Sequence, residues 1–138
     1  MNNSSIFTEK LRSSGLRPTK QRIQICKILF DRKDTFHFTI NDLNSYIKKT
    51  TSELISLATV YNTINALKDK GYLKEIHTNN QEAYFDTNVS NHHHFFDVNK
   101  KQLIDLSSED VEQIKIKKSL PDKKIQSVEL LIKVVSKK

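Results

Sequence analysis

Residues 56–71 constrain the fold of this chain more than any other stretch, because they combine a complete helix signature with two chemically different faces. Ser56 is a favourable helix N-cap, and Gly71 is a favourable residue just past a helix C-terminus. Between them, apolar residues recur at helical spacing, which predicts one buried face. That apolar face consists of Leu57, Val60, Ile64 and Leu67.

The opposite face of this predicted helix is small, polar and uncharged. Amide side chains can pair with adenine and methyl groups can meet thymine, so such a face suits reading of the DNA major groove. The alternative is an ordinary solvated helix face, and the order of the neighbouring elements has to decide between the two. The face consists of Ala58, Asn62 and Asn65, flanked by Thr59 and Tyr61.

Short amphipathic helices are predicted ahead of this segment, over about residues 6–15, 18–30 and 39–49. Behind it, residues 72–77 and 82–86 have the composition of two strands joined by a polar turn. Three helices, a fourth with a readable face and then a two-stranded wing are the order of a winged helix-turn-helix module. In such a module the last helix enters the major groove.

The remainder of the chain has a different texture. Residues 95–98 and 102–106 predict a second hairpin, Ser107 can cap a short helix, and residues 125–135 predict a last strand. A sheet this small is marginal alone, so we expect a homodimer whose two reading helices match a palindromic site. The predicted fold class is α+β, with a winged-helix domain at 1–88 and an α/β dimerisation and effector-binding domain at 89–138.

Charge and cysteine content narrow the partners and the compartment. A formal charge of +7 in 138 residues favours nucleic acid over a membrane surface, and residues 1–38 carry eight Lys or Arg against three acids. A single cysteine, Cys26, excludes an internal disulfide and a tetracysteine zinc site, and fits the cytoplasm. No apolar run approaches the ~18 residues of a membrane span.

Three of the five histidines lie together at positions 92–94. On a strand, His92 and His94 would point one way and His93 the other, so two imidazoles share a side. The carboxylates of Asp86 and Asp105 flank that pair, and the set could bind a transition metal. The alternative is a solvated histidine cluster. His37 stands alone in a predicted connector, where a histidine is more often an ordinary loop or cap residue.

The chain resembles the ferric uptake regulator family of bacterial metal-responsive transcription factors. The motifs that carry the resemblance are Gly15-Leu16-Arg17-Pro18-Thr19 with Gln21-Arg22, the reading-helix signature Ile55-Ser56-Leu57-Ala58-Thr59-Val60-Tyr61, Gly71, and the histidine run after a tyrosine-bearing wing.

The resemblance implies a regulatory site for Fe(II), Mn(II) or Zn(II) at the junction of the two halves. It also implies a second site that would use His93 and Glu112, although the C-terminal histidine of that site is missing here. The implied metal ligands are His37, Asp86, His92, His94 and Asp105. The implied DNA-binding residues are Arg17, Thr19, Arg22, Ala58, Thr59, Tyr61, Asn62 and Asn65.

Departures from the usual pattern look like the iron response regulator branch of alphaproteobacteria, in which Thr-Val-Tyr is followed by asparagine and the histidine run by Phe-Phe. Here these residues are Asn62 and Phe95-Phe96. Branch members bind haem through the histidine run, so His92, His93 and His94 are haem candidates. Cys26 is followed by Lys27, so the Cys-Pro haem motif of some members is absent.

Together these features predict a dimeric, non-enzymatic regulator of iron-responsive genes that binds an AT-rich operator under the control of haem or a divalent metal. The alternatives are a peroxide or other-metal sensor of the same family and a small non-haem metalloenzyme that uses the same histidines and carboxylates.

Overall fold

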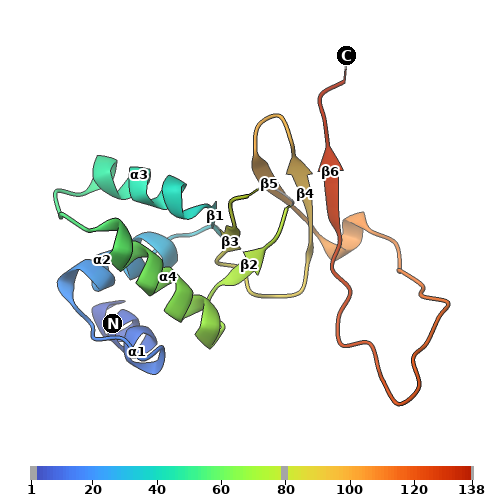
Figure 1. The fold of residues 1–138 in the computed structure, drawn as a ribbon, viewed down its shortest axis with the longest axis horizontal. Coiled ribbons are helices and arrows are strands. Elements are labelled where there is room, and N and C mark those ends of the chain that lie inside the picture. The colour runs from blue at the N-terminus through green and yellow to red at the C-terminus, as the bar shows by residue number, and fades with distance from the viewer. Residues whose placement is uncertain (1–2, 79–80, 138) are drawn as a thin grey trace. The chain divides into compact units, whose positions relative to one another are not determined.

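The computed structural model describes residues 3–78 and 81–137, and the chain divides into two compact units, Met1–Val89 and Ser90–Lys138, here termed the first and second units. The first unit holds the α-helices, and the second is built on a three-stranded sheet (Figure 1). The α+β class predicted from the sequence is confirmed. Among the helices of the described residues, none combines the length and apolar character needed to cross a bilayer.

The start of the second helix differs from the sequence prediction. Thr19 is the N-cap, because its hydroxyl accepts the backbone N–H of Arg22 at 3.3 Å, and Pro18 therefore lies outside the helix rather than in its first turn. The helices of the described first unit are α1 (Asn3–Ser13), α2 (Lys20–Phe30), α3 (Ile40–Thr50) and α4 (Leu57–Lys70).

The ends of α3 and α4 follow the predicted local chemistry. At the start of α3, Thr39 and Asp42 form a capping box in which each side chain binds the other's backbone N–H. Ser56 caps α4 through the N–H of Thr59, and Gly71 ends it at a φ of 96°, a left-handed conformation that glycine adopts without steric cost.

The predicted wing is present and carries an additional strand. β2 (Lys74–Ile76) and β3 (Tyr84–Asp86) are antiparallel, and β1 (His37–Phe38) pairs with the other edge of β3. The sequence assigned residues 36–38 to a connector, but aromatic packing makes residues 37–38 a strand. Phe38 is 1% exposed and stacks on Phe85 of β3 with ring centroids 5.6 Å apart. Residues 79–80 of the predicted turn lie outside the described residues.

Helix α4 is central to the first unit, because it packs against α1, α2 and α3. Its buried face differs from the prediction at two positions: Leu57, expected in the core, is 44% exposed, and Thr63 is fully buried. Leu57 is the first residue of α4 and lies outside the part of the helix that packs in the core. Cys26 of α2 is fully buried, as its place in an apolar stripe predicted. The fully buried core includes Leu11, Ile25, Leu29, Leu43, Val60, Ile64 and Leu67.

The second unit contains β4 (His93–Asp97), β5 (Gln102–Leu106) and β6 (Leu131–Val134) in the order β5-β4-β6. β5 is antiparallel to β4, which confirms the predicted second hairpin, and β6 runs parallel to β4 along its other edge. β6 is shorter than the strand predicted over 125–135.

The helix expected after Ser107 is wrong beyond its first turn. Only the 3₁₀ turn η1 (Ser108–Asp110) forms, and residues 111–130 have neither helix nor strand. Capping chemistry starts the turn, since Ser107 donates its backbone N–H to the Asp110 carboxylate. It does not continue because the β-branched residues Val111 and Ile114 favour helix poorly and are only partly buried.

Candidate metal centre and DNA-reading face

One histidine–carboxylate pair lies in the first unit, across the β1–β3 ladder. His37 and Asp86 are directly opposite each other in register, and His37 Nε2 lies 3.0 Å from Asp86 Oδ2. The Asp86 side chain is fully buried, and its Oδ1 accepts the backbone N–H of Asn88 at 2.8 Å. This pair depends on β1, which aromatic packing holds beside β3.

The pair offers one nitrogen and one oxygen as ligand atoms for a metal ion, and these two atoms already face each other. A buried carboxylate needs a partner that neutralises its charge, and either a protonated His37 or a bound cation would supply one. A divalent ion would take the place of the proton between the two groups, because metal ligands bind in their deprotonated forms. The residue pattern by itself gave no reason to place His37 next to Asp86, 49 positions along the chain, whereas the family resemblance implied both as ligands of one site.

A second cluster lies within the second unit, on β4 and β5. His94 is opposite Asp105 in the strand register, and its Nε2 lies 3.3 Å from Asp105 Oδ1. His92, just before β4, brings its own Nε2 to 3.2 Å from the same oxygen. The two imidazole rings have centroids 4.3 Å apart, and His94 is 4% exposed. Alternation along the chain predicted that these two histidines share a side, and they do.

The hydrogen bonds of His92 determine which ring nitrogen remains for a cation. Its Nδ1 lies 2.7 Å from the carbonyl oxygen of Ser90, which can only accept, so Nδ1 carries a proton. In the neutral ring Nε2 then carries a lone pair that points at the Asp105 carboxylate. Two lone pairs at that distance repel unless a proton or a metal ion lies between them. Orientation of a histidine by a backbone carbonyl is typical of metal ligands.

The separations between these donor atoms also fit a metal ion. Around a tetrahedral ion with bonds of about 2.0–2.1 Å, neighbouring ligand atoms lie about 3.3 Å apart. The two nitrogen-to-oxygen distances at Asp105 Oδ1 are 3.2 and 3.3 Å. Two imidazole nitrogens and one carboxylate oxygen suit Fe(II), Mn(II) or Zn(II) and do not distinguish them.

The structure does not bring His93 to the other two histidines of the run. Its ring lies on the opposite side of β4, where Nδ1 accepts the backbone N–H of Leu130 at 2.9 Å and ties the start of β6 to β4. Glu112, the other residue of the predicted second site, is exposed and follows η1. His93 therefore has a structural partner of its own.

The outward face of α4 is the one predicted from the sequence. Thr59 differs from its neighbours, because it is partly buried and its hydroxyl is hydrogen-bonded to Ser56 Oγ at 2.9 Å. Tyr61 is 46% exposed. The exposed residues of this face are Ala58, Tyr61, Asn62 and Asn65.

The N-terminal DNA-binding candidates surround the turn before α2. Arg17 and Thr19 are exposed, and Arg22 is partly buried. Arg22 Nη1 donates to the Arg17 carbonyl at 3.1 Å, and Thr19 caps the helix, so both residues also shape the turn that displays Arg17.

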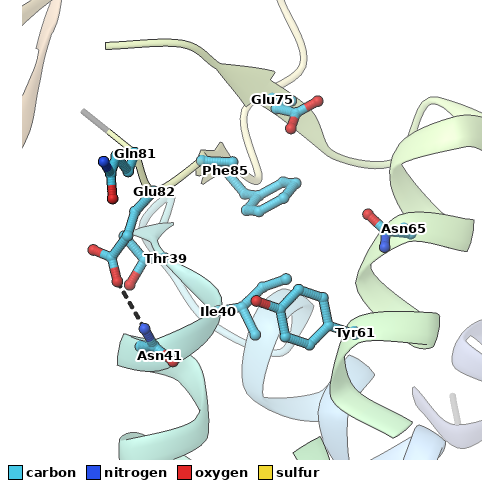
Figure 2. A pocket seen from close by; sticks show the side chains of 10 residues that line it. Thr39, Ile40, Asn41, Tyr61, Asn65, Glu75, Gln81, Glu82 and Phe85 are labelled. Atoms are coloured by element: carbon cyan, nitrogen blue, oxygen red, sulfur yellow. Dashed lines mark hydrogen bonds between the residues drawn. The ribbon is translucent and has the colours of Figure 1, made fainter. Parts of the chain in front are cut away.

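A cleft of about 270 Å³, which the sequence did not predict, opens between α4, the N-terminus of α3 and the wing (Figure 2). Tyr61 and Asn65 line it from α4, and Asn41 donates a hydrogen bond to Glu82 Oε1 at 2.7 Å on the other side. Its charged lining groups are two carboxylates, Glu82 and Glu75, of which Glu75 is paired with Lys68 at 3.5 Å. The cleft lies between the exposed polar face of α4 and the strands of the wing.

Comparison with known proteins was made at the levels of family, sequence and fold. A sequence model of the protein family described as "Ferric uptake regulator family" matches residues 13–134 of this chain. The chain is 28% identical over 108 residues to a ferric uptake regulation protein of Haemophilus ducreyi, over 77% of this chain and 72% of that protein. It is 33% identical over 84 residues to the peroxide-responsive repressor PerR of Staphylococcus aureus, over 61% of this chain and 55% of that protein.

Solved structures share the fold at low sequence identity. A ferric uptake regulator from Pseudomonas aeruginosa, solved with manganese, has a TM-score of 0.69 at 20% identity and covers 96% of this chain and 99% of its own. The regulator of Vibrio cholerae has a TM-score of 0.69 at 19% identity and covers 94% of this chain and 98% of its own. These likenesses establish the fold.

Proposed function

The chain belongs to the ferric uptake regulator family of metal-responsive transcriptional regulators, and on that premise we propose that it binds duplex DNA in response to a divalent metal ion. One observation carries the proposal. The Nε2 atoms of His92 and His94 meet at one oxygen of Asp105, and His92 is held in the tautomer that leaves Nε2 for a cation.

The proposed regulatory ligands are the two clusters described above. His92, His94 and Asp105 supply three donors, and His37 and Asp86 supply two more. When bound, a divalent ion supplies positive charge that these groups share in place of protons. The chain's own residues orient it: the Ser90 carbonyl fixes the His92 ring, and the Asn88 N–H holds the Asp86 carboxylate.

A small ion fits the second cluster better than haem does. An imidazole that ligates haem must present a nitrogen to an open face, whereas His94 is buried and the Nε2 of His92 faces the Asp105 carboxylate at 3.2 Å. His93 has its Nδ1 occupied by Leu130. These contacts support a divalent metal as the effector. Haem bound at His92, His93 and His94 is the alternative, and the titration below would detect it.

On the DNA side, we propose that α4 reads bases and that the turn before α2 binds phosphates. The exposed amides of Asn62 and Asn65 can pair with adenine, and Ala58 can meet a thymine methyl group, which favours an AT-rich operator. Each chain presents one such helix, so a homodimer on a palindromic operator is expected. The proposed DNA-binding residues are Arg17, Thr19, Arg22, Ala58, Thr59, Tyr61, Asn62 and Asn65.

The test is a titration of metal-free protein with Mn(II), Fe(II), Zn(II) and, separately, haem, with binding to operator duplex read at fixed salt. The double variant His92→Ala, His94→Ala should keep its fold but lose the effect of metal on DNA binding. His77→Ala is the matched control, because His77 is 81% exposed and belongs to neither cluster. A double variant that still responds to metal would refute the assignment.

Metal stoichiometry then resolves how the two clusters are used. One ion per chain, lost in the His92, His94 variant and weakened by Asp86→Ala, would mean that all five residues serve one ion. Retention of one ion after His37→Ala and Asp86→Ala would assign the regulatory ion to His92, His94 and Asp105 alone.

Peroxide sensing is the second candidate, favoured by the 33% identity to a peroxide-responsive repressor. An iron-loaded sensor of this kind would gain an oxygen atom on His37 or His92 when treated with peroxide and would then release DNA. Mass spectrometry of peptides from treated and untreated protein distinguishes this from simple metal response. The relatives are named as regulators, which weighs against the small metalloenzyme considered from the ligand types.

A further inference from the structure

The most positively charged segment of the second unit has no part in either metal cluster. Residues 115–124, here termed the lysine turn, hold five lysines and one acid, Asp122. The segment lies between η1 and β6, where the chain forms neither helix nor strand and loops out from the sheet of its unit (Figure 1). Every residue in it is exposed. The five lysines are Lys115, Lys117, Lys118, Lys123 and Lys124.

A tight turn gathers these lysines. Lys123 donates its backbone N–H to the Leu120 carbonyl at 3.2 Å, and Asp122 has a φ of 61°. Pro121 followed by a residue with positive φ is the pattern of a type II β-turn, in which proline presets the second position. Two lysine pairs, 117–118 and 123–124, therefore stand on the two arms of one turn instead of being spread along a strand.

Within residues 3–78 and 81–137, the charge of the lysine turn is not offset by ion pairs. Among the ion pairs of the part of the chain that the structure describes, none involves these five lysines. Loops as long as residues 111–130 without regular structure are uncommon in compact domains and are often functional. Concentrated, unpaired, fully exposed ammonium groups are suited to a polyanion.

We propose that the lysine turn is a second DNA contact, which binds backbone phosphates without regard to sequence while α4 reads the bases. This inference rests on the proposed DNA-binding function. Lysine suits phosphate contacts because it is a compact point charge with donors only, and such contacts position a protein without reading sequence. The segment has reach: six residues lie between Lys124 and Leu131, and the seven backbone steps from one to the other span up to about 25 Å when extended.

An anionic lipid surface is the other partner that such a segment could suit, because Ile116, Leu120 and Ile125 are exposed beside the lysines. DNA is favoured, since the family acts on DNA and phosphate contacts need only the lysines. A lipid surface would need the aliphatic side chains as well, and a binding experiment separates the two.

The test measures how duplex affinity falls with salt for the full-length protein loaded with Mn(II). Two duplexes are used: an AT-rich inverted repeat selected from random sequences by the wild-type protein, and a shuffled copy of it. The variant replaces the lysines at 117, 118, 123 and 124 by glutamine. The slope of log affinity against log salt should fall by about 0.9 for each lost phosphate contact, so by up to about 3.6, and both duplexes should lose affinity equally.

A matched pair of double variants controls for net charge. Lys123→Gln with Lys124→Gln removes two charges from the lysine turn, and Lys100→Gln with Lys101→Gln removes two from the β4–β5 turn of the same unit. The first should lower the salt slope and the second should not. The proposal would be overturned if the two double variants had equal salt slopes, or if the Lys123, Lys124 variant kept the wild-type slope.

Two further arms identify the reason for a negative result. Flotation with phosphatidylglycerol vesicles should show no binding that depends on the lysine turn. Vesicle binding lost in the quadruple variant, with duplex slopes unchanged, would overturn the proposal in favour of lipid. If the wild-type protein selects no sequence, the proposed function fails, yet the salt slope on an unselected duplex of random sequence still reports whether the lysine turn contacts phosphate.

Discussion

Replacement of Asp86 by alanine tests whether a candidate metal ligand also stabilises the metal-free fold. The Asp86 side chain is fully buried, and its oxygens take part in hydrogen bonds with His37 Nε2 at 3.0 Å and the Asn88 N–H at 2.8 Å. Because Asp86 is on β3 and His37 is opposite it on β1, loss of the carboxylate removes a side-chain contact between these two strands. The prediction concerns the metal-free protein, so metal binding does not enter the measured stability.

The expected cost of Asp86→Ala is about 3 kcal/mol in the free energy of unfolding of the first unit. Hydrogen bonds to a charged group contribute about 1.5–3 kcal/mol each, and removal of a buried ion's desolvation cost offsets part of the loss. Asp86→Asn keeps an acceptor for the Asn88 N–H and should cost about half as much. For a unit of this size, about 3 kcal/mol corresponds to a fall in Tm of at least about 12 °C.

The measurement is urea and thermal unfolding of metal-free protein, followed by circular dichroism at the helical bands, which report the first unit. Asp42→Ala is the matched control in the same unit: Asp42 Oδ2 also accepts a backbone N–H, that of Thr39 at 3.2 Å, but the residue is exposed. It should cost less than half as much. A cost below about 1 kcal/mol for Asp86→Ala would refute the reasoning that burial makes these bonds valuable.

Three other predictions follow from single side chains. Burial raises the pKa of the Cys26 thiol to about 12, and Lys10 lowers it by a smaller amount, so Cys26 in the folded protein should resist thiol reagents. Relative to Cys26→Ala, the stability that Cys26 contributes below pH 9 should be lost as the pH rises towards 12. Tyr61→Ala should weaken operator binding more than shuffled-duplex binding, with Tyr61→Phe separating hydroxyl from ring. Thr39→Ala should destabilise α3 by about 1 kcal/mol, seen in urea unfolding.

Local chemistry accounts for the parts of the fold that sequence predicted. The capping box at Thr39, the Ser56 cap and the left-handed Gly71 each depend on residues within a few positions of one another, so the bounds of α3 and α4 could be read directly. The shared side of His92 and His94 follows likewise from alternation along an extended chain.

Tertiary packing accounts for what sequence did not predict. β1 contains only two residues and exists because Phe38 packs on Phe85, a contact across 47 positions of the chain. Leu57 has the right spacing for the core but lies at the helix start, beyond the packed region. The segment after Ser107 has a good cap and lacks a buried face, so capping alone did not produce a helix.

The second cluster explains why a bound cation should alter more than the charge of the site. A cation between His92 Nε2 and Asp105 Oδ1 favours the ring orientation in which Nδ1 also donates to the Ser90 carbonyl, and without a cation that orientation loses this support. The contact therefore links ion binding to the geometry of residues 90–92, which directly follow the end of the first unit. A ligand shifts a conformational equilibrium only through differential interaction with the two states, and this contact supplies such a difference. Metal should therefore stabilise one geometry of the chain between Asp86 and His92, and hydrogen exchange at the amides of residues 87–92 should slow on addition of Mn(II) in wild type but not in the His92→Ala, His94→Ala variant.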